Sequence, residues 1–417
     1  MTRAMQANPE LLTAKLEFER QEGIRLQIRS RLLPNITGSG SVNEREQGLV
    51  DVSPSQRALP PSADTAVALF GYDLRVEVRQ LVFDGFSSWH QAKRQKLLAS
   101  QAYQNFRTSV LKTASLVRQG FDAVGLHSVL LLSEQRRVEE FAQLVEWTRR
   151  RHGVGEVPEF ELIRAEAELE GAKADVAEAA RALGQSEQAF RRLLQITEWT
   201  GPLKLEGEFG PRRFGLPMDE ALRVAVARRP DLQGMELALE AARSNERSQI
   251  GTYLPKVEVF ASYGTRSSYY NSAIQLEGWT VGALGQWSIF DGGAARGRRL
   301  TARAERRMAD TKLAETKLQI GSRLRELYQA LEHARVAIDA QGKSLALSSR
   351  AARDARRSFE VGQANLEQVL QADLSQRRAD SRHKEAIYAY NALVADIELA
   401  VGGELEDSIG APESWKP

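Results

Sequence analysis

The sequence contains no cysteine among its 417 residues. This absence excludes a disulfide framework, a thiolate metal site and a lipidated N-terminal cysteine. It also fits an oxidising compartment, where a stray thiol is a liability.

Long apolar runs and an excess of one charge are absent as well. No apolar stretch approaches the roughly 18 residues that a membrane-spanning helix needs. Residues 1–22 lack the apolar core of a signal peptide. The 57 Lys and Arg nearly balance the 55 Asp and Glu, giving a net charge of +2. A nucleic-acid partner is not expected, because such binding usually needs a clustered basic face.

The residues of catalysis and of ligand binding are also poorly represented. The five histidines show no metal-ligand spacing, and the glycine-rich stretch 292–297 lacks the Lys-Ser/Thr that completes a phosphate loop. No serine lies in a nucleophile elbow. We therefore expect no enzyme activity, no cofactor and no bound metal.

An internal repeat is present instead. The tetrapeptide VFDG at 82–85 returns as IFDG at 289–292, an offset of 207 positions, and Val154-Gly155 returns as Val361-Gly362 at the same offset. In both copies 71 positions separate the Asp of FDG from the Gly of VG. A loop would tolerate insertions over such a span, whereas a continuous helix that must reach a fixed depth would not.

A second pair of matching motifs, upstream of FDG, has a different offset. NPEL at 8–11 matches RPDL at 229–232 with an offset of 221 rather than 207, so the first copy carries 14 additional residues between this motif and FDG. They fall in the Pro-, Ser- and charge-rich stretch 42–66, which has the composition of a loop. The predicted organisation is a first structural repeat at 1–205, a second at 206–402 and a C-terminal tail at 403–417.

The 221 offset also bears on the N-terminus. It sets Met1 opposite Leu222, inside a predicted helix. We therefore expect the first copy to begin partway through an element, with its signal peptide missing from this sequence. The lack of a signal peptide is thus no evidence for the cytoplasm.

Each copy contains two strand patterns. Within residues 73–83, apolar side chains at 74, 76 and 78 alternate with charged ones at 75, 77 and 79. Residues 278–290 carry Trp279 and Trp287 at the two ends of an apolar face. Eight residues of strand span about 26 Å at about 3.3 Å per residue. That length matches the apolar band of a transmembrane barrel strand between aromatic girdles. Soluble hairpins with one wet face remain an alternative, although an isolated hairpin is marginal in water.

The FDG tripeptide has the composition of a strand-to-helix junction. Asp84 and Asp291 are favourable N-cap residues, because their carboxylates accept from free N–H groups of a starting helix. Gly85 and Gly292 ease the change of direction.

Long helices are predicted after each junction. Residues 86–151 and 293–360 contain no proline, and each stretch would span about 100 Å as a helix at 1.5 Å per residue. The Val-Gly pairs then end the helix, and return helices are expected at 157–198 and from 364 to about 401. Each copy is thus a strand pair on a long helical hairpin.

This order of motifs, repeated twice over residues 8–402, resembles the outer membrane factors, which are TolC-like efflux proteins. The resemblance implies a mostly helical homotrimer with a β-barrel portion. Four strands per chain would form a 12-stranded barrel in outer-membrane lipid, above a long periplasmic α-helical, coiled-coil tunnel. It also implies a passive export duct of a tripartite efflux or type I secretion system. The partners would be a periplasmic adaptor (membrane fusion) protein and an inner-membrane transporter.

Residue roles at the tunnel tip follow from the resemblance. Val154, Gly155, Val361 and Gly362 would meet the adaptor at the two tip turns. Some family members place acidic residues that ring the tip constriction where this sequence has two glutamines and, in the first copy, a glutamate. These constriction candidates are Glu161, Gln368 and Gln371. We therefore expect a tip that is weakly cation-selective at most.

The rival prediction is a coiled-coil structural scaffold of the cell envelope without a pore. It would have to account for two tryptophans bracketing an apolar strand face and for strands in both copies. Insertion into lipid separates the two predictions.

Overall fold

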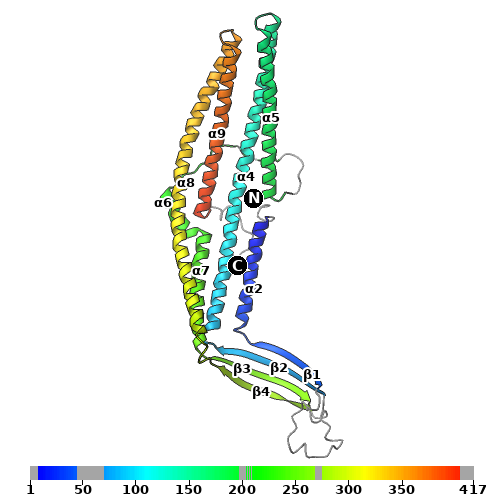
Figure 1. Cartoon of the computed structure of the whole chain (residues 1–417), viewed down its shortest axis with the longest axis vertical. Coiled ribbons are helices and arrows are strands. Elements are labelled where there is room, and N and C mark those ends of the chain that lie inside the picture. The colour runs from blue at the N-terminus through cyan, green and yellow to red at the C-terminus, as the bar shows by residue number, and fades with distance from the viewer. Residues whose placement is uncertain are drawn as a thin grey trace, which may run out of the picture. The chain divides into compact units, whose positions relative to one another are not determined.

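The computed structural model describes residues 8–44, 70–196, 203, 205, 207, 209–267 and 275–403. These residues are mostly helical, with one four-stranded sheet (Figure 1). The chain divides into two compact units. The hairpin unit comprises Met1–Leu16, Gln104–Gln233 and Ala314–Pro417. The sheet unit comprises Glu17–Tyr103 and Gly234–Leu313.

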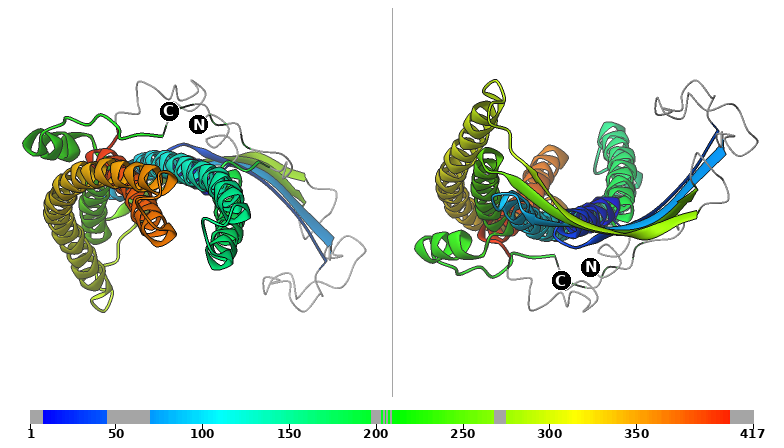
Figure 2. Two further views of the ribbon diagram at one scale, coloured as in Figure 1. Left: turned by 90° about the horizontal axis from the view of Figure 1, so that it is seen from above. Right: turned by 90° about the horizontal axis from the view of Figure 1, so that it is seen from below.

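The sheet is an antiparallel meander in the order β1-β2-β3-β4. Its strands are β1 (Asn35–Glu44), β2 (Phe70–Phe83), β3 (Lys256–Ser267) and β4 (Gln275–Gln286). Figure 2 shows them as one curved layer. All four predicted strands are therefore present. Most of the predicted loop at 42–66 lies outside the described residues, although β1 takes up its first three positions.

The two faces of the sheet differ in polarity. Residues directly opposite one another on antiparallel strands share a face. One such row consists of Ile36, Val78, Ala261 and Val281. The adjacent row, one position along each strand and on the other face, consists of Thr37, Glu77, Ser262 and Thr280. The apolar face is exposed, with Val281 66% and Trp279 75% accessible. Such a sheet needs an apolar environment on one side and water on the other.

The end of β4 differs from the prediction of one strand over 278–290. The strand ends at Gln286, so only the first of the two tryptophans lies in it. Trp287 follows the strand, and its indole N–H donates to the Tyr253 carbonyl oxygen at 3.2 Å. The strand ends here because of its neighbour β3. The next pair of the ladder would involve Pro255, which precedes β3 and has no N–H to donate.

The helices that adjoin the sheet are α2 (Pro9–Ser30) and α7 (Pro230–Ser248), the latter followed by the short η3 (Gln249–Tyr253). Both α2 and α7 begin at a proline, whose missing N–H is not needed at the first helical position. The predicted helix starts at the two NP/RP motifs are confirmed. Asn8 caps α2 by accepting from the Glu10 N–H at 2.8 Å.

The long helices are α4 (Ser87–Gly153) and α8 (Ala294–Glu360), and both contain 67 residues. They return through α5 (Glu159–Leu193) and α9 (Leu366–Val401), and α6 (Met218–Arg228) packs against α9. The predicted helical hairpins are confirmed to within a few residues at their ends.

A compact apolar core lies near the turns of the two hairpins. It holds side chains from α4, α5, α8 and α9. Its buried members are Phe141, Val145, Ala165, Ala172, Phe359, Leu366, Val369 and Leu370. Burial of such a stripe is what stabilises helices of this length.

Candidate functional site

The turns at the ends of the two hairpins have the same geometry. Gly155 and Gly362 adopt left-handed backbone angles, with φ of +75° and +77°. The Gly155 N–H donates to the His152 carbonyl oxygen at 2.9 Å, and the next N–H donates to Arg151 at 2.9 Å. This pair of bonds is a Schellman motif, which satisfies the last carbonyl groups of the helix. The preceding valines lie exposed at the apex, Val154 at 72% and Val361 at 68%.

The second turn leads into α9 through a capping box. The Asn365 side-chain oxygen accepts from the Gln368 N–H at 3.0 Å, and the Gln368 side-chain oxygen accepts from the Asn365 N–H at 3.1 Å. Gln368 is exposed, but its amide oxygen is engaged by the backbone. The N-x-x-Q spacing could have indicated this cap from the sequence.

The other two constriction candidates lie close to the same turns. The Gln371 side chain is exposed and donates to Glu367 at 2.9 Å. Glu161 lies half-buried in the first turn of α5.

An ion pair between Arg164 on α5 and Glu367 on α9 joins the two hairpins near their tips. The hydrogen bond from Arg164, followed by that from Gln371, lowers the pKa of Glu367 below its usual value. The first acidic group of α9 is thus compensated by an arginine. No local motif in the sequence marks this pair, because the partners are 203 positions apart.

Arg151 forms a second link between the tips. Its guanidinium lies 4.6 Å from the Trp147 ring centroid, and its Nε donates to Glu156 at 2.7 Å. Its Nη1 reaches the Phe359 carbonyl oxygen at 3.4 Å. The Trp147 and Phe359 rings pack with centroids 4.6 Å apart. Cation–π and ring contacts thus hold the last turn of α4 against the last turn of α8.

A buried ionic network lies deeper in the hairpins. Arg137 on α4 donates through Nε to Asp373 on α9 at 2.9 Å and through Nη1 to Asp175 on α5 at 2.8 Å. Arg356 on α8 also donates to Asp373, at 3.1 Å, and Arg377 on α9 donates to Glu134 on α4 at 2.8 Å. Burial alone would lower the pKa of Arg137, but its hydrogen bonds to Asp373 and Asp175 raise it above the usual value. Arg137 therefore stays protonated, and the network around it connects all four helices.

The two FDG junctions share one capping scheme. The Asp84 side chain accepts from the Ser88 N–H at 2.8 Å, and Asp291 accepts from the Ala295 N–H at 2.7 Å. Gly85 and Gly292 both have φ of +66°, a region that favours glycine. The first junction is also crowded, since a Cβ on Gly85 would lie 2.7 Å from the Cα of Gly251.

Comparison with known proteins identifies this architecture. The outer membrane efflux protein family matches residues 221–403. A solved structure of CusC, described as forming a transmembrane channel, superposes with a TM-score of 0.82 at 17% identity over 96% of this chain and 91% of CusC. The second half of the chain thus matches the outer membrane efflux proteins in sequence, and nearly the whole chain has the fold of CusC.

Other comparisons agree. The CmeC outer membrane channel of Campylobacter jejuni superposes with a TM-score of 0.79 at 18% identity, over 98% of this chain and 85% of that one. The toluene efflux pump outer membrane protein TtgC of Pseudomonas putida is 24% identical over 266 residues, which are 62% of this chain. The chain spans about half the length (52%) of the curated relatives it matches. The family description and the names of these relatives all refer to proteins of the outer membrane.

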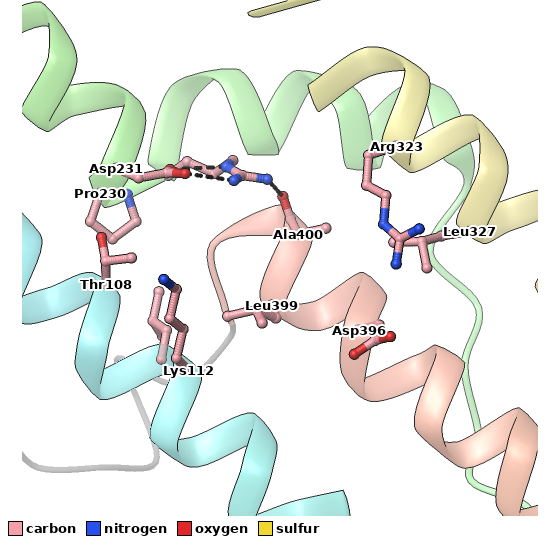
Figure 3. A pocket seen from close by; sticks show the side chains of 11 residues that line it. Thr108, Lys112, Pro230, Asp231, Arg323, Leu327, Asp396, Leu399 and Ala400 are labelled. Atoms are coloured by element: carbon pink, nitrogen blue, oxygen red, sulfur yellow. Dashed lines mark hydrogen bonds and ion pairs between the residues drawn. The ribbon is translucent and has the colours of Figure 1, made fainter. Parts of the chain in front are cut away.

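A pocket of about 230 Å³ lies in the hairpin unit, where α6 gives way to α7 (Figure 3). On one side Arg229 forms two bonds to Asp231, at 3.0 and 2.6 Å, and a third to the Ala400 carbonyl oxygen at 2.9 Å. Burial alone would raise the pKa of Asp231, but the Arg229 bonds and charge lower it below its usual value. The pocket also exposes Lys112 from α4 and Arg323 from α8. The Arg229 contacts tie the end of α9 to the helix break.

Within the described part of the chain, no cluster of three or more His, Asp or Glu side chains could hold a metal ion. Of the helices in the same residues, none combines the length and apolar character needed to cross a membrane.

Proposed function

We propose that this outer membrane efflux protein is the passive export duct of a tripartite efflux or type I secretion system. In this role three copies combine their sheets into one 12-stranded barrel, and their hairpins form the periplasmic tunnel. Small molecules or polypeptides pass through it from an inner-membrane transporter and a periplasmic adaptor to the outside.

The observation that carries the proposal is a two-faced sheet with two open edges. Among the described strands, β1 pairs only with β2 and β4 pairs only with β3. Hydrocarbon cannot satisfy open edges, so a sheet with an apolar face can enter a membrane only when it closes. Pairing of β4 of one copy with β1 of the next would close it and leave the row of Thr37, Glu77, Ser262 and Thr280 facing the lumen.

The hairpin ends support the contact with an adaptor. Val154 and Val361 are exposed apolar side chains at the apex of two rigid Schellman turns. Exposed apolar groups on ordered turns are suited to burial against a partner protein. We assign Val154-Gly155 and Val361-Gly362 to this contact.

The tip constriction is proposed to be lined by Gln371, Gln368 and Glu161. The nearest acidic side chain on α9, Glu367, is paired with Arg164. A lining of amides beside a compensated carboxylate gives weak cation selectivity at most.

Single-channel conductance of the full chain tests the proposal. The oligomer is extracted from membranes and added to a planar lipid bilayer. Discrete, long-lived steps with weak ion selectivity are expected. A soluble protein that never inserts would favour the coiled-coil scaffold instead. Strong block by a trivalent cation would overturn the assignment of the tip alone, because only clustered carboxylates bind such an ion tightly.

A further inference from the structure

The first turns of α8 carry a strong excess of positive charge. Residues 294–313 contain seven cationic side chains and only two acidic ones. The cations are Arg296, Arg298, Arg299, Arg303, Arg306, Arg307 and Lys312. This helix directly follows the sheet, since β4 ends at Gln286 and α8 begins at Ala294 (Figure 1).

Four of these arginines form a stripe along one face of the helix. Spacings of three, four and four residues bring side chains onto the same side of an α-helix. We call Arg296, Arg299, Arg303 and Arg307 the basic stripe. All four are exposed, and none forms an ion pair with another described residue. Arg298 and Arg306, by contrast, lie off the stripe and pair with Asp291 and Glu246.

The neighbouring helix α7 covers a different face of α8. The side that meets α7 is marked by the buried Ala295 and Ala302 and by the Arg306–Glu246 bond of 2.7 Å. At 100° per residue, Arg296, Arg303 and Arg307 lie roughly 60–140° around the helix from these positions, and Arg299, at the near edge of the stripe, lies roughly 20–60° from them. All four side chains are exposed, so the stripe is open to a further partner.

The first copy has interfacial residues at the corresponding place. The 207-residue offset relates Trp89 to Arg296 and Lys96 to Arg303. Trp89 is 53% exposed, and the Lys93 ammonium lies 5.9 Å from its ring centroid. Tryptophan beside lysine is typical of the water–lipid boundary.

Helix stability does not account for these cations. The N-terminus of a helix carries a partial positive charge, so arginine in the first turns is unfavourable. Neither α4 nor α8 has an acidic residue in its first turn. The arginines of the stripe also repel one another at their spacing of three and four residues. A negatively charged partner outside the chain would reverse both costs.

We propose that the basic stripe binds anionic phospholipid headgroups of the periplasmic leaflet. The inference rests on the proposed barrel, whose apolar face sets the depth of the sheet in the membrane. The headgroup layer is about 5–7 Å thick on each side of the hydrocarbon. Arg296 and Arg299 lie in the first two turns of α8, and Arg307 lies about 17 Å beyond Arg296 along the axis. Arg296 and Arg299 make the direct contacts, and Arg303 and Arg307 add a longer-range attraction that salt screens within about 8–10 Å.

The experiment compares the intact oligomer in nanodiscs of phosphatidylcholine containing increasing phosphatidylglycerol. The annular enrichment of phosphatidylglycerol is measured for wild type, R296Q/R299Q and R303Q/R307Q. A matched control, R325Q/K343Q/R350Q/R353Q, removes exposed cations further along the same helix. One juxtamembrane cation is worth about fivefold in affinity for an anionic surface. We expect R296Q/R299Q to lose about 25-fold, R303Q/R307Q clearly less, and the control nothing.

Each other outcome overturns the inference in a recognisable way. Equal phosphatidylglycerol enrichment in all variants would contradict lipid binding by the basic stripe. Unchanged lipid enrichment with altered ion selectivity of the conductance assigns the stripe to the lumen instead. Loss of the oligomer in R296Q/R299Q assigns it to a contact between copies. Failure of the wild-type protein to insert into lipid would contradict the proposed duct as well. Conducting channels without a preference for phosphatidylglycerol would contradict only the proposed lipid site.

Discussion

The Nε of Arg137 donates to the Asp373 carboxylate at 2.9 Å, and the two side chains are only 12% and 7% exposed. They belong to different hairpins and lie 236 positions apart. This contact fixes α9 against α4 where both helices approach their tips. A transition that separates the hairpins would have to break it.

Asp373→Asn keeps the shape of the side chain and removes its charge. Arg137 and Arg356 are then left partly uncompensated in a buried site, which costs about 3 kcal/mol or more. Hydrogen exchange of the α9 amides near residue 373 should accelerate by about 100-fold or more. Glu178→Gln breaks a fully exposed pair with Arg181 and should leave exchange unchanged. Equal protection in the two variants would show that the network does not hold the hairpins together.

Gly155→Ala and Gly153→Ala form a matched pair two residues apart. An L-residue at the φ of +75° of Gly155 costs about 1–2 kcal/mol. Gly153 lies in the last turn of α4 with open space around an added Cβ, so alanine there should stabilise the helix by about 0.5–1 kcal/mol. Exchange of the amides in the last turn of α4 should rise in the first variant and fall in the second. The Schellman turn is not the stabilising feature if both change in the same direction.

Val281→Arg and Thr280→Arg test the two faces of the sheet at neighbouring positions. Val281 lies near the middle of β4 on the apolar face, where arginine should cost about 2–4 kcal/mol in the membrane. Thr280 lies on the polar face and should accept arginine with a normal yield of oligomer. The T280R channel should then shift toward anion selectivity. Yield of heat-resistant oligomer and reversal potential are the measurements, and a normal yield of V281R would contradict the assigned faces.

The Arg164–Glu367 pair should persist across the physiological pH range. Its partners lower the pKa of Glu367 below the usual 4.5, so the carboxylate binds fewer protons when folded than when unfolded. The stabilisation is therefore complete above about pH 4.5 and is lost as the pH falls through the lower folded value. Conductance of wild type and E367Q should differ by a constant offset from pH 8 to 5 and converge only below 4.5, where wild type loses the charge that the variant lacks. Convergence already near pH 6 would mean that Glu367 is not held by Arg164.

Much of this architecture is readable in the sequence because its determinants are local. Period-two alternation defines β2, and the absence of proline over more than sixty residues permits α4 and α8. A glycine after a valine marks both tip turns, since only glycine adopts a positive φ at little cost. The failure at Trp287 is instructive, because a strand ends where its neighbour ends, and that neighbour is fixed by Pro255 on a different strand.

The sequence by itself determined the duplicated plan of strands, junctions, long helices and turns, through short-range rules that need no partner in space. Only the tertiary structure decided which charges meet. Arg137 with Asp373 and Arg164 with Glu367 are long-range pairs among 112 charged side chains, 57 basic and 55 acidic. Arg229 likewise reaches the distant carbonyl oxygen of Ala400 at the end of α9. Periodicity places each of these side chains on a helix face, but many faces carry both signs. The packing of one hairpin on the other selects the pairs, because it is packing that sets which faces come within hydrogen-bonding distance.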